Sequence, residues 1–189
     1  PPLAPQEQPL CIIGDIHGRA DLLDELVLQI CTQGSVQGMR VVLVGDLIDR
    51  GPDSAGVLAR VREWMAKPAP FAEVICLMGN HEAMMLDFLA EPTLHGPRWL
   101  AHGGDASLQS FGLSPYQRSE QGTPDARLIG LRDALREMLP SGLEAWLQDL
   151  PQLWQEQALV ISHAGADPAR TISQQTVKSL LWGHPRFHS

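Results

Sequence analysis

Positive charge is scarce in this sequence. Its 189 residues include 14 lysines and arginines against 22 aspartates and glutamates, which gives a formal net charge of -8. A surplus of negative charge repels a polyanion at long range, so we expect neither nucleic acid nor an anionic membrane as a partner. Any anionic ligand must therefore be met by local positive charge.

Cysteines and long apolar runs are also few. Cys11, Cys31 and Cys76 are odd in number and lack the spacing of a metal site, so we interpret them as reduced thiols. No apolar run approaches the roughly 20 residues that cross a bilayer, and no charged start precedes an apolar segment as in a secretion signal. We therefore expect a cytoplasmic protein.

Apolar strands alternate with amphipathic helices in the first half of the chain. The run "LCIIGD" precedes a helical pattern over 19–34, and "MRVVLVGD" precedes another over 54–66. The third unit begins with "FAEVICLMG" and continues into a helix after residue 80. This alternation predicts βαβ units in an α/β fold, with a sheet that is covered on both faces.

The pattern changes between residue 91 and about residue 150. We expect a mainly helical insertion there, with helices near 106–112, 126–139 and 141–150 and a loose segment over 113–125. An apolar strand over 158–162 then resumes the sheet. The length suits a single domain over residues 1–189.

Short polar clusters follow four of the expected strands. They are "GDIHG" at 14–18, "GDLIDRG" at 45–51, "GNHE" at 79–82 and "SHAG" at 162–165. Strand ends of an α/β sheet meet at one edge, so these residues are expected to converge. Carboxylate, imidazole and amide oxygen ligands suit Mn²⁺, Fe or Zn²⁺, and two ions can share one carboxylate.

Each cluster alone has a simpler explanation. A single Gly-Asp after a strand is more often a turn than a metal site. Turn chemistry alone does not readily produce Asp-x-His, Asp-x-x-Asp-Arg and Asn-His-Glu at successive strand ends. The repetition therefore favours a metal centre.

The three motifs GDIHG, GDLIDRG and GNHE resemble the signatures of the PPP family of metallophosphatases, in particular its bacterial and phage-type serine/threonine protein phosphatases. The resemblance covers about residues 11–90 and continues more weakly from His163 to Trp182. Glu82 favours this family over the diadenosine tetraphosphatases, which usually have aspartate there. The resemblance implies a metallophosphoesterase-like β-sheet sandwich flanked by helices. The segment "WLAHGGDASLQSFG" resembles one that helps to build the substrate side in bacterial members.

The resemblance also implies two divalent metal ions, with Mn²⁺ first and Fe or Zn²⁺ as alternatives. Asp15 and His17 would bind the first ion, Asp46 would bridge both, and Asn80 and His163 would bind the second. A water or hydroxide that bridges the metals would attack phosphorus directly, so no phosphoenzyme is expected.

Four further residues receive roles from the same resemblance. His81 would act as the general acid, and Asp49 would orient it. Arg50 would bind phosphate oxygens through its planar fork, and Arg186 would be a second phosphate-binding arginine.

One expected ligand is missing from the sequence. Family members normally supply another histidine to the second metal from a late Gly-His motif, and this sequence ends before such a motif. We expect an incomplete carboxyl end with this histidine beyond residue 189. The alternatives are that His184 or His188 replaces it, or that the second metal site is weak.

The resulting hypothesis is a phosphatase that hydrolyses phosphoserine, phosphothreonine and also phosphotyrosine monoesters in a phosphoprotein or phosphopeptide. A dinucleoside polyphosphate hydrolase is a second hypothesis, and a non-catalytic phosphate-recognition module is a third. The general acid His81 favours an enzyme, because a pure binder has little use for one. The physiological substrate, the regulation and the oligomeric state are not specified by the sequence.

Overall fold

The computed structural model describes residues 9–33, 36–114 and 123–187. Its centre is a parallel sheet in the order β1 (Leu10–Ile13), β2 (Arg40–Leu43) and β3 (Glu73–Cys76). Ile13 lies opposite Leu43, and Leu43 lies opposite Cys76, so the three strands end at the same level. The loops that carry the three motifs therefore leave the sheet at one edge.

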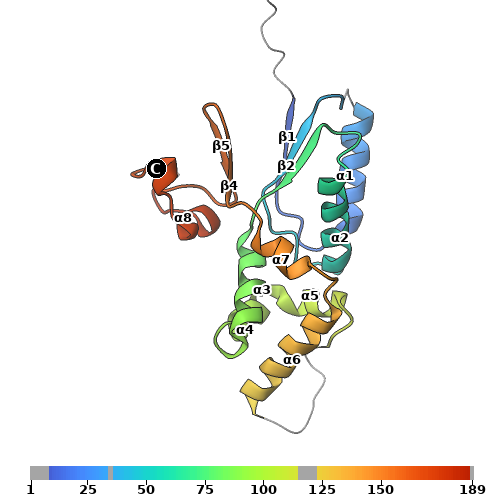
Figure 1. Cartoon of the computed structure of the whole chain (residues 1–189), viewed down its shortest axis with the longest axis vertical. Coiled ribbons are helices and arrows are strands. Elements are labelled where there is room, and N and C mark those ends of the chain that lie inside the picture. The colour runs from blue at the N-terminus through green and yellow to red at the C-terminus, as the bar shows by residue number, and fades with distance from the viewer. Residues whose placement is uncertain (1–8, 34–35, 115–122, 188–189) are drawn as a thin grey trace, which may run out of the picture.

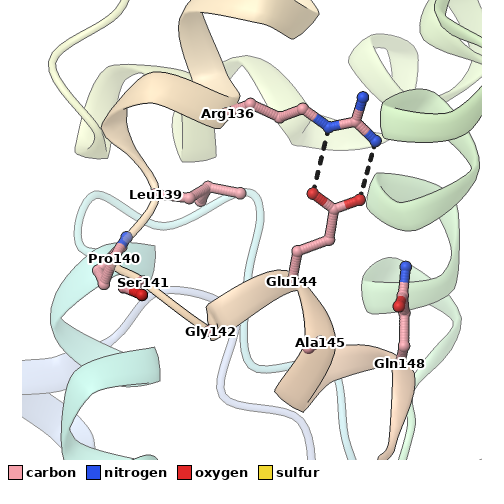
Figure 2. Close-up of a pocket in the computed structure, with 8 residues that line it drawn as sticks. All are labelled: Arg136, Leu139, Pro140, Ser141, Gly142, Glu144, Ala145 and Gln148. Atoms are coloured by element: carbon pink, nitrogen blue, oxygen red, sulfur yellow. Dashed lines mark hydrogen bonds and ion pairs between the residues drawn. The ribbon is translucent and has the colours of Figure 1, made fainter.

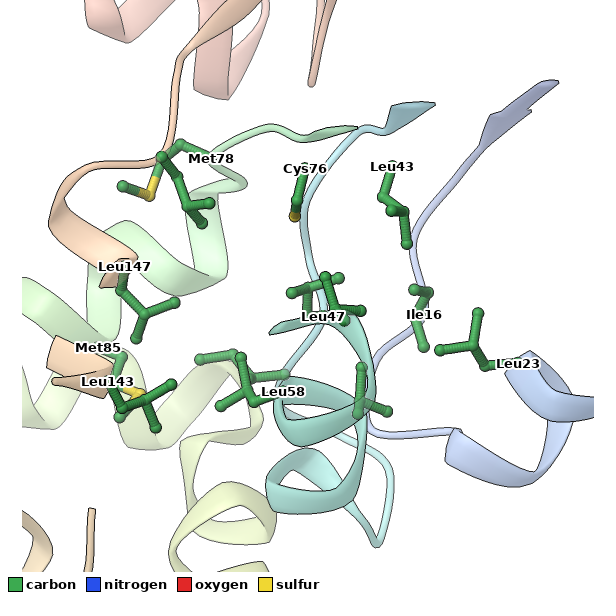
Figure 3. Close-up of a cluster of buried hydrophobic side chains, with 14 of the residues drawn as sticks. Ile16, Leu23, Leu43, Leu47, Leu58, Cys76, Met78, Met85, Leu143 and Leu147 are labelled. Atoms are coloured by element: carbon green, nitrogen blue, oxygen red, sulfur yellow. The ribbon is translucent and has the colours of Figure 1, made fainter. Parts of the chain in front are cut away.

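Two helices, α1 (Ala20–Gln33) and α2 (Ser54–Ala66), cover one face of this sheet (Figure 1). Asp53 caps the amino-terminal end of α2, and its side chain accepts a hydrogen bond from the Gly56 N–H at 2.8 Å. Side chains alternate along a strand, so Val41 and Leu43 join the larger core with the helices, whereas Val42 points to the opposite face. Figure 3 shows Leu43 and Leu58 among the buried side chains of this larger core.

The opposite face is covered by a β-hairpin and not by helices. Strands β4 (Leu153–Glu156) and β5 (Leu159–Ser162) pair antiparallel and form a second sheet. Ile161 packs with Val42 and Leu77 in a small second core. The sandwich is thus confirmed, but the expectation that 158–162 resumes the first sheet is wrong. The reason is the tight reversal after β4, where Gln157 has a φ of 50° and returns the chain onto β4.

The described residues between 91 and 150 are mainly helical. After α3 (Asn80–Ala90), it contains α4 (Pro92–Trp99), a π-helix at Leu100–Gly104 and α5 (Asp105–Ser110). It continues with α6 (Pro124–Met138) and α7 (Leu143–Gln148). Most of the expected loose segment, 115–122, lies outside the described residues. Arg136 and Glu144 pair at 2.9 Å beside a pocket between α6 and α7 (Figure 2).

The described chain ends with a 3₁₀ turn at Ile172–Gln174 and with α8 (Val177–Trp182). The Arg98 guanidinium lies 4.3 Å from the centre of the Trp182 ring, which joins α8 to α4. Among the helices that the structure describes, none has the length and apolar character needed to cross a bilayer.

Candidate metal centre

The loops that follow β1 and β2 are held in an unusual backbone conformation. His17, Asp46, Asp49 and Arg50 all have positive φ angles, between 45° and 72°. Residues with side chains rarely adopt this left-handed region, and such strain is concentrated at functional sites. Contacts with the surrounding structure must hold these four residues in this conformation. Neighbouring glycines allow the loops to come close enough for such contacts.

Gly45 and Gly79 allow the second and third loops to meet. A Cβ atom on Gly45 would lie 2.3 Å from the backbone nitrogen of Gly79, and one on Gly79 would lie 2.2 Å from that of Asp46. Only a pair of glycines permits backbones to approach so closely. The contact between these two loops therefore requires glycine at both position 45 and position 79.

Asp46 is the centre of the site, and its residue is only 3% exposed. One of its oxygens, Oδ2, lies 3.6 Å from His17 Nε2 and 3.8 Å from His81 Nε2. The other, Oδ1, lies 3.5 Å from His163 Nε2 and accepts the backbone N–H of His81 at 3.0 Å. The three imidazole contacts are longer than good hydrogen bonds.

The tautomers of two of these histidines follow from their partners. The Nδ1 atom of His17 lies 2.9 Å from the Ile48 carbonyl, and that of His163 lies 3.0 Å from the Val44 carbonyl. A carbonyl only accepts, so each Nδ1 carries the proton and each Nε2 presents a lone pair. Lone pairs therefore face the Asp46 carboxylate, an arrangement that a cation stabilises.

The donor set fits metal ions. Two groups have their ligand atoms within 4.8 Å of one another: His17, Asp46 and His81 in one, and Asp15, Asp46 and His163 in the other. Asp46 belongs to both. The side-chain oxygen of Asn80 is buried and has no hydrogen-bond partner among the described residues, which leaves it available as a ligand.

His81 and Asp49 form a buried pair beside these ligands. The Nδ1 atom of His81 lies 2.7 Å from Asp49 Oδ2, and both side chains are almost completely buried. The Arg50 guanidinium spans the two imidazoles, with Nη2 at 2.9 Å from His81 Nε2 and Nη1 at 2.8 Å from His17 Nε2. The structure thus brings an imidazole, a carboxylate and a fixed positive charge to one place.

Sequence reasoning missed three residues that support this arrangement. Trp99 donates its indole N–H to Asp49 Oδ2 at 2.9 Å, and the Ser107 hydroxyl donates to Asp49 Oδ1 at 2.6 Å. The third is Glu82, which is fully buried on α3. Trp99 and Ser107 lie in the segment "WLAHGGDASLQSFG", whose resemblance pointed to the substrate side. Nothing in this segment indicates a contact with Asp49.

Glu82 ties the second loop to the third. Its carboxylate accepts the backbone N–H groups of Asp46, Leu47, Ile48 and Gly79 at 2.8 to 3.3 Å. Burial and the neighbouring Asp46 carboxylate raise the pKa of Glu82 to about 7, while the hydrogen bonds from Asp46 and Leu47 lower it.

The remaining predicted residues lie toward the carboxyl end. Arg186 is exposed after α8, where its backbone N–H donates to His184. His184 Nε2 lies 3.8 Å from Asp167 and belongs to neither of the two ligand groups found among the described residues. His188 lies outside the described residues. The roles proposed for Arg186 and His184 stay predictions.

The fold and the shared carboxylate define the class of protein. Nitrogen and carboxylate ligands around one buried aspartate, beside an oriented imidazole and an arginine, are the equipment of a metal-dependent phosphoesterase. The chain belongs to the calcineurin-like phosphoesterase family, whose sequence profile matches residues 9–184. Enzymes of this family are hydrolases that bind two divalent metal ions.

Curated relatives match up to half of the chain. The chain is 43% identical over 95 residues to serine/threonine-protein phosphatase 1 of Salmonella typhimurium, and 38% identical over 95 residues to serine/threonine-protein phosphatase 2 of Escherichia coli. Each match covers 50% of this chain and 38% of the relative. The chain is also 36% identical over 76 residues to bis(5'-nucleosyl)-tetraphosphatase PrpE of Oceanobacillus iheyensis, which covers 37% of this chain and 29% of that protein.

Solved structures show the same fold. A protein provisionally described as a diadenosine tetraphosphatase has a TM-score of 0.58 at 23% identity, over 94% of this chain and 60% of its own. The cold-active protein-tyrosine phosphatase of a psychrophilic Shewanella has a TM-score of 0.53 at 19% identity, over 90% of this chain and 46% of its own.

Proposed function

We propose that this protein is a metal-dependent phosphoprotein phosphatase that hydrolyses phosphoserine and phosphothreonine monoesters, and phosphotyrosine as well. The observation that carries the proposal is the contact chain from Asp49 through His81 to Arg50, beside the ligands around Asp46. The names of the two bacterial phosphatase relatives support the choice of substrate class.

His81 is the proposed proton donor. Its Nδ1 donates to Asp49, and its Nε2 accepts an N–H of Arg50 at 2.9 Å. Nε2 can therefore carry the proton for transfer once Arg50 turns its N–H groups to the substrate. An alkoxide is a poor leaving group unless it is protonated as it departs, and this is the step that His81 performs. Asp49 keeps the imidazole in the correct orientation and stabilises its charged form.

Arg50 is the proposed phosphate-binding residue. Its exposed guanidinium offers N–H groups in a plane, which matches two oxygens of a phosphate monoester. One of its N–H groups donates to His17 Nε2 at 2.8 Å, and an ion held by His17 would free this N–H for the substrate.

Asp15, His17, Asp46, Asn80 and His163 are the proposed ligands of two divalent ions, with Mn²⁺ preferred over Fe and Zn²⁺. When bound, the ions neutralise the phosphate charge and lower the pKa of the attacking water. We also propose a cytoplasmic location, which the three free cysteines support.

Dinucleoside polyphosphate hydrolysis is the second candidate. It is supported by the likeness to the tetraphosphatase of Oceanobacillus iheyensis. Glu82, which follows the motif histidine, favours the phosphoprotein substrate instead.

The two candidates are separated by comparing substrates on metal-stripped protein, with and without added Mn²⁺. We expect Mn²⁺-dependent hydrolysis of p-nitrophenyl phosphate and of a phosphoserine peptide, and much slower cleavage of diadenosine tetraphosphate. A reversed preference would select the second candidate. Phosphopeptide binding with metal bound and without turnover of any substrate would indicate a recognition module and contradict both.

A further inference from the structure

The helical region between residues 91 and 150 reaches directly into the proposed catalytic pair. Trp99 ends α4 and Ser107 lies on α5, and both are completely buried against Asp49. They are 50 and 58 positions from Asp49 in the sequence, so these contacts exist only because the insertion folds over the strand ends.

The contacts fix both oxygens of the Asp49 carboxylate. Ser107 donates to Oδ1 at 2.6 Å, whereas Trp99 donates to Oδ2 at 2.9 Å, the same oxygen that faces His81 at 2.7 Å. A carboxylate anchored at each oxygen cannot rotate about its own axis. The Asp49 backbone N–H donates to Ser107 Oγ at 2.9 Å, which also fixes the main chain.

Packing holds the Trp99 donor in turn. The Trp99 ring stacks on Phe88 at 4.9 Å between ring centres, and a Cβ atom on Gly104 would lie 2.5 Å from the Trp99 ring. A buried indole N–H requires an acceptor, and a buried carboxylate requires donors, so each group satisfies the other.

We infer that Trp99 and Ser107 are positioning residues for the general acid, and that the insertion is therefore part of the machinery that protonates the leaving group. This inference rests on the proposed function. It predicts that loss of either donor slows turnover most for substrates whose leaving group needs a proton. An alkoxide needs one, whereas p-nitrophenolate does not.

The variants Trp99→Phe and Ser107→Ala test this inference, because each removes one donor and little volume. Matched controls are Trp146→Phe on α7, where the ring faces Arg62, and Ser110→Ala on α5, where the hydroxyl accepts the Ala55 N–H at 2.8 Å. For each of the two test variants, turnover of a phosphoserine peptide is expected to fall roughly tenfold, the scale of a lost hydrogen bond to a charged group, with p-nitrophenyl phosphate changed by less than about threefold.

A second readout does not depend on turnover. In metal-free protein with ¹⁵N-labelled histidine, the His81 Nδ1–H resonance should shift in Trp99→Phe and Ser107→Ala and stay in place in both controls. Equal losses on both substrates, or an unmoved resonance in folded variants, would overturn the inference. If the wild-type protein hydrolyses neither substrate, the proposed function fails, while the resonance still shows whether the two donors position His81.

Discussion

At the scale of single residues, His81 and Asp49 share one proposed task, which is protonation of the leaving group. The Asp49 carboxylate is completely buried, and its contact with Nδ1 orients the imidazole so that Nε2 points toward Asp46. An oriented imidazole can transfer a proton without first searching for its geometry, which is the advantage of a site built on packed elements.

Replacing His81 by asparagine removes the proton donor while a similar polar volume remains. We expect His81→Asn to bind two equivalents of metal and to turn over a phosphoserine peptide roughly 10²-fold more slowly, the scale of a lost general acid. Metal analysis of the purified variant and steady-state kinetics check the two parts. His95→Asn on α4 is the control. Wild-type turnover in His81→Asn would remove this residue from the mechanism.

Glu82 makes stability depend on pH. Its pKa is raised from the ordinary 4.5 to about 7. Between pH 4.5 and pH 7, Glu82 is therefore protonated in the folded state and ionised in the unfolded state. This proton stabilises the folded state fully below pH 4.5, and the stabilisation disappears as pH rises through 7. The free energy of unfolding changes by up to about 3 kcal/mol over this range. The pKa values of Asp21 and Glu156 are lowered, so their stabilisation is gained as pH rises toward 4.5. It is already complete at the start of this pH window.

Urea unfolding of the metal-free protein between pH 4.5 and 7 measures this effect. The free energy of unfolding should decrease with pH in the wild type and stay level in Glu82→Gln. Glutamine has no proton to lose in this range, so residue 82 of the variant adds no pH dependence. Parallel curves for the two proteins would refute the assignment to Glu82.

At the scale of elements, the contact between the second and third loops fixes the strand ends. Gly45→Ala places a Cβ atom against the Gly79 backbone at a φ of 99°, so we expect a loss of at least about 2 kcal/mol in stability. Gly130→Ala on α6 is the matched control, since nothing lies within 4 Å of its added Cβ atom, and it should stabilise by about 0.5 to 1 kcal/mol. Thermal unfolding distinguishes them, and equal shifts of the same sign would contradict the packing argument.

The elements also show which features are visible in the sequence. The three strands and their loops were predictable, because apolar runs that end in Gly-Asp and Gly-Asn are local signals. Strand β4, Leu153–Glu156, was not expected, because it has only four residues and tertiary contact decides its partner. The contacts of Trp99 and Ser107 with Asp49 could not be predicted, since no local pattern connects residues so far apart.

At the scale of the whole molecule, the hairpin delivers a proposed ligand from the other side of the sheet. His163 follows β5, and Ile161 anchors this strand in the core with Val42 and Leu77. Ile161→Ala should cost about 2 to 4 kcal/mol in stability and also weaken binding of the second Mn²⁺. Leu159→Ala, at a side chain that is 46% exposed on the same strand, should change neither. Calorimetric Mn²⁺ titration checks the claim, and unchanged affinity for both ions would show that His163 is not positioned by this core.

The position of His163 also sets an order of events during folding. Its hydrogen bond to the Val44 carbonyl closes a loop of 119 residues, whereas the His81 contact with Asp49 closes one of only 32. Short loops close at lower entropic cost, so the contacts among the first three motifs form early, and docking of the hairpin comes late. On a ribosome, the proposed ligands in the first three motifs emerge long before His163. We therefore expect a cation that requires His163 to be captured only after the hairpin has docked.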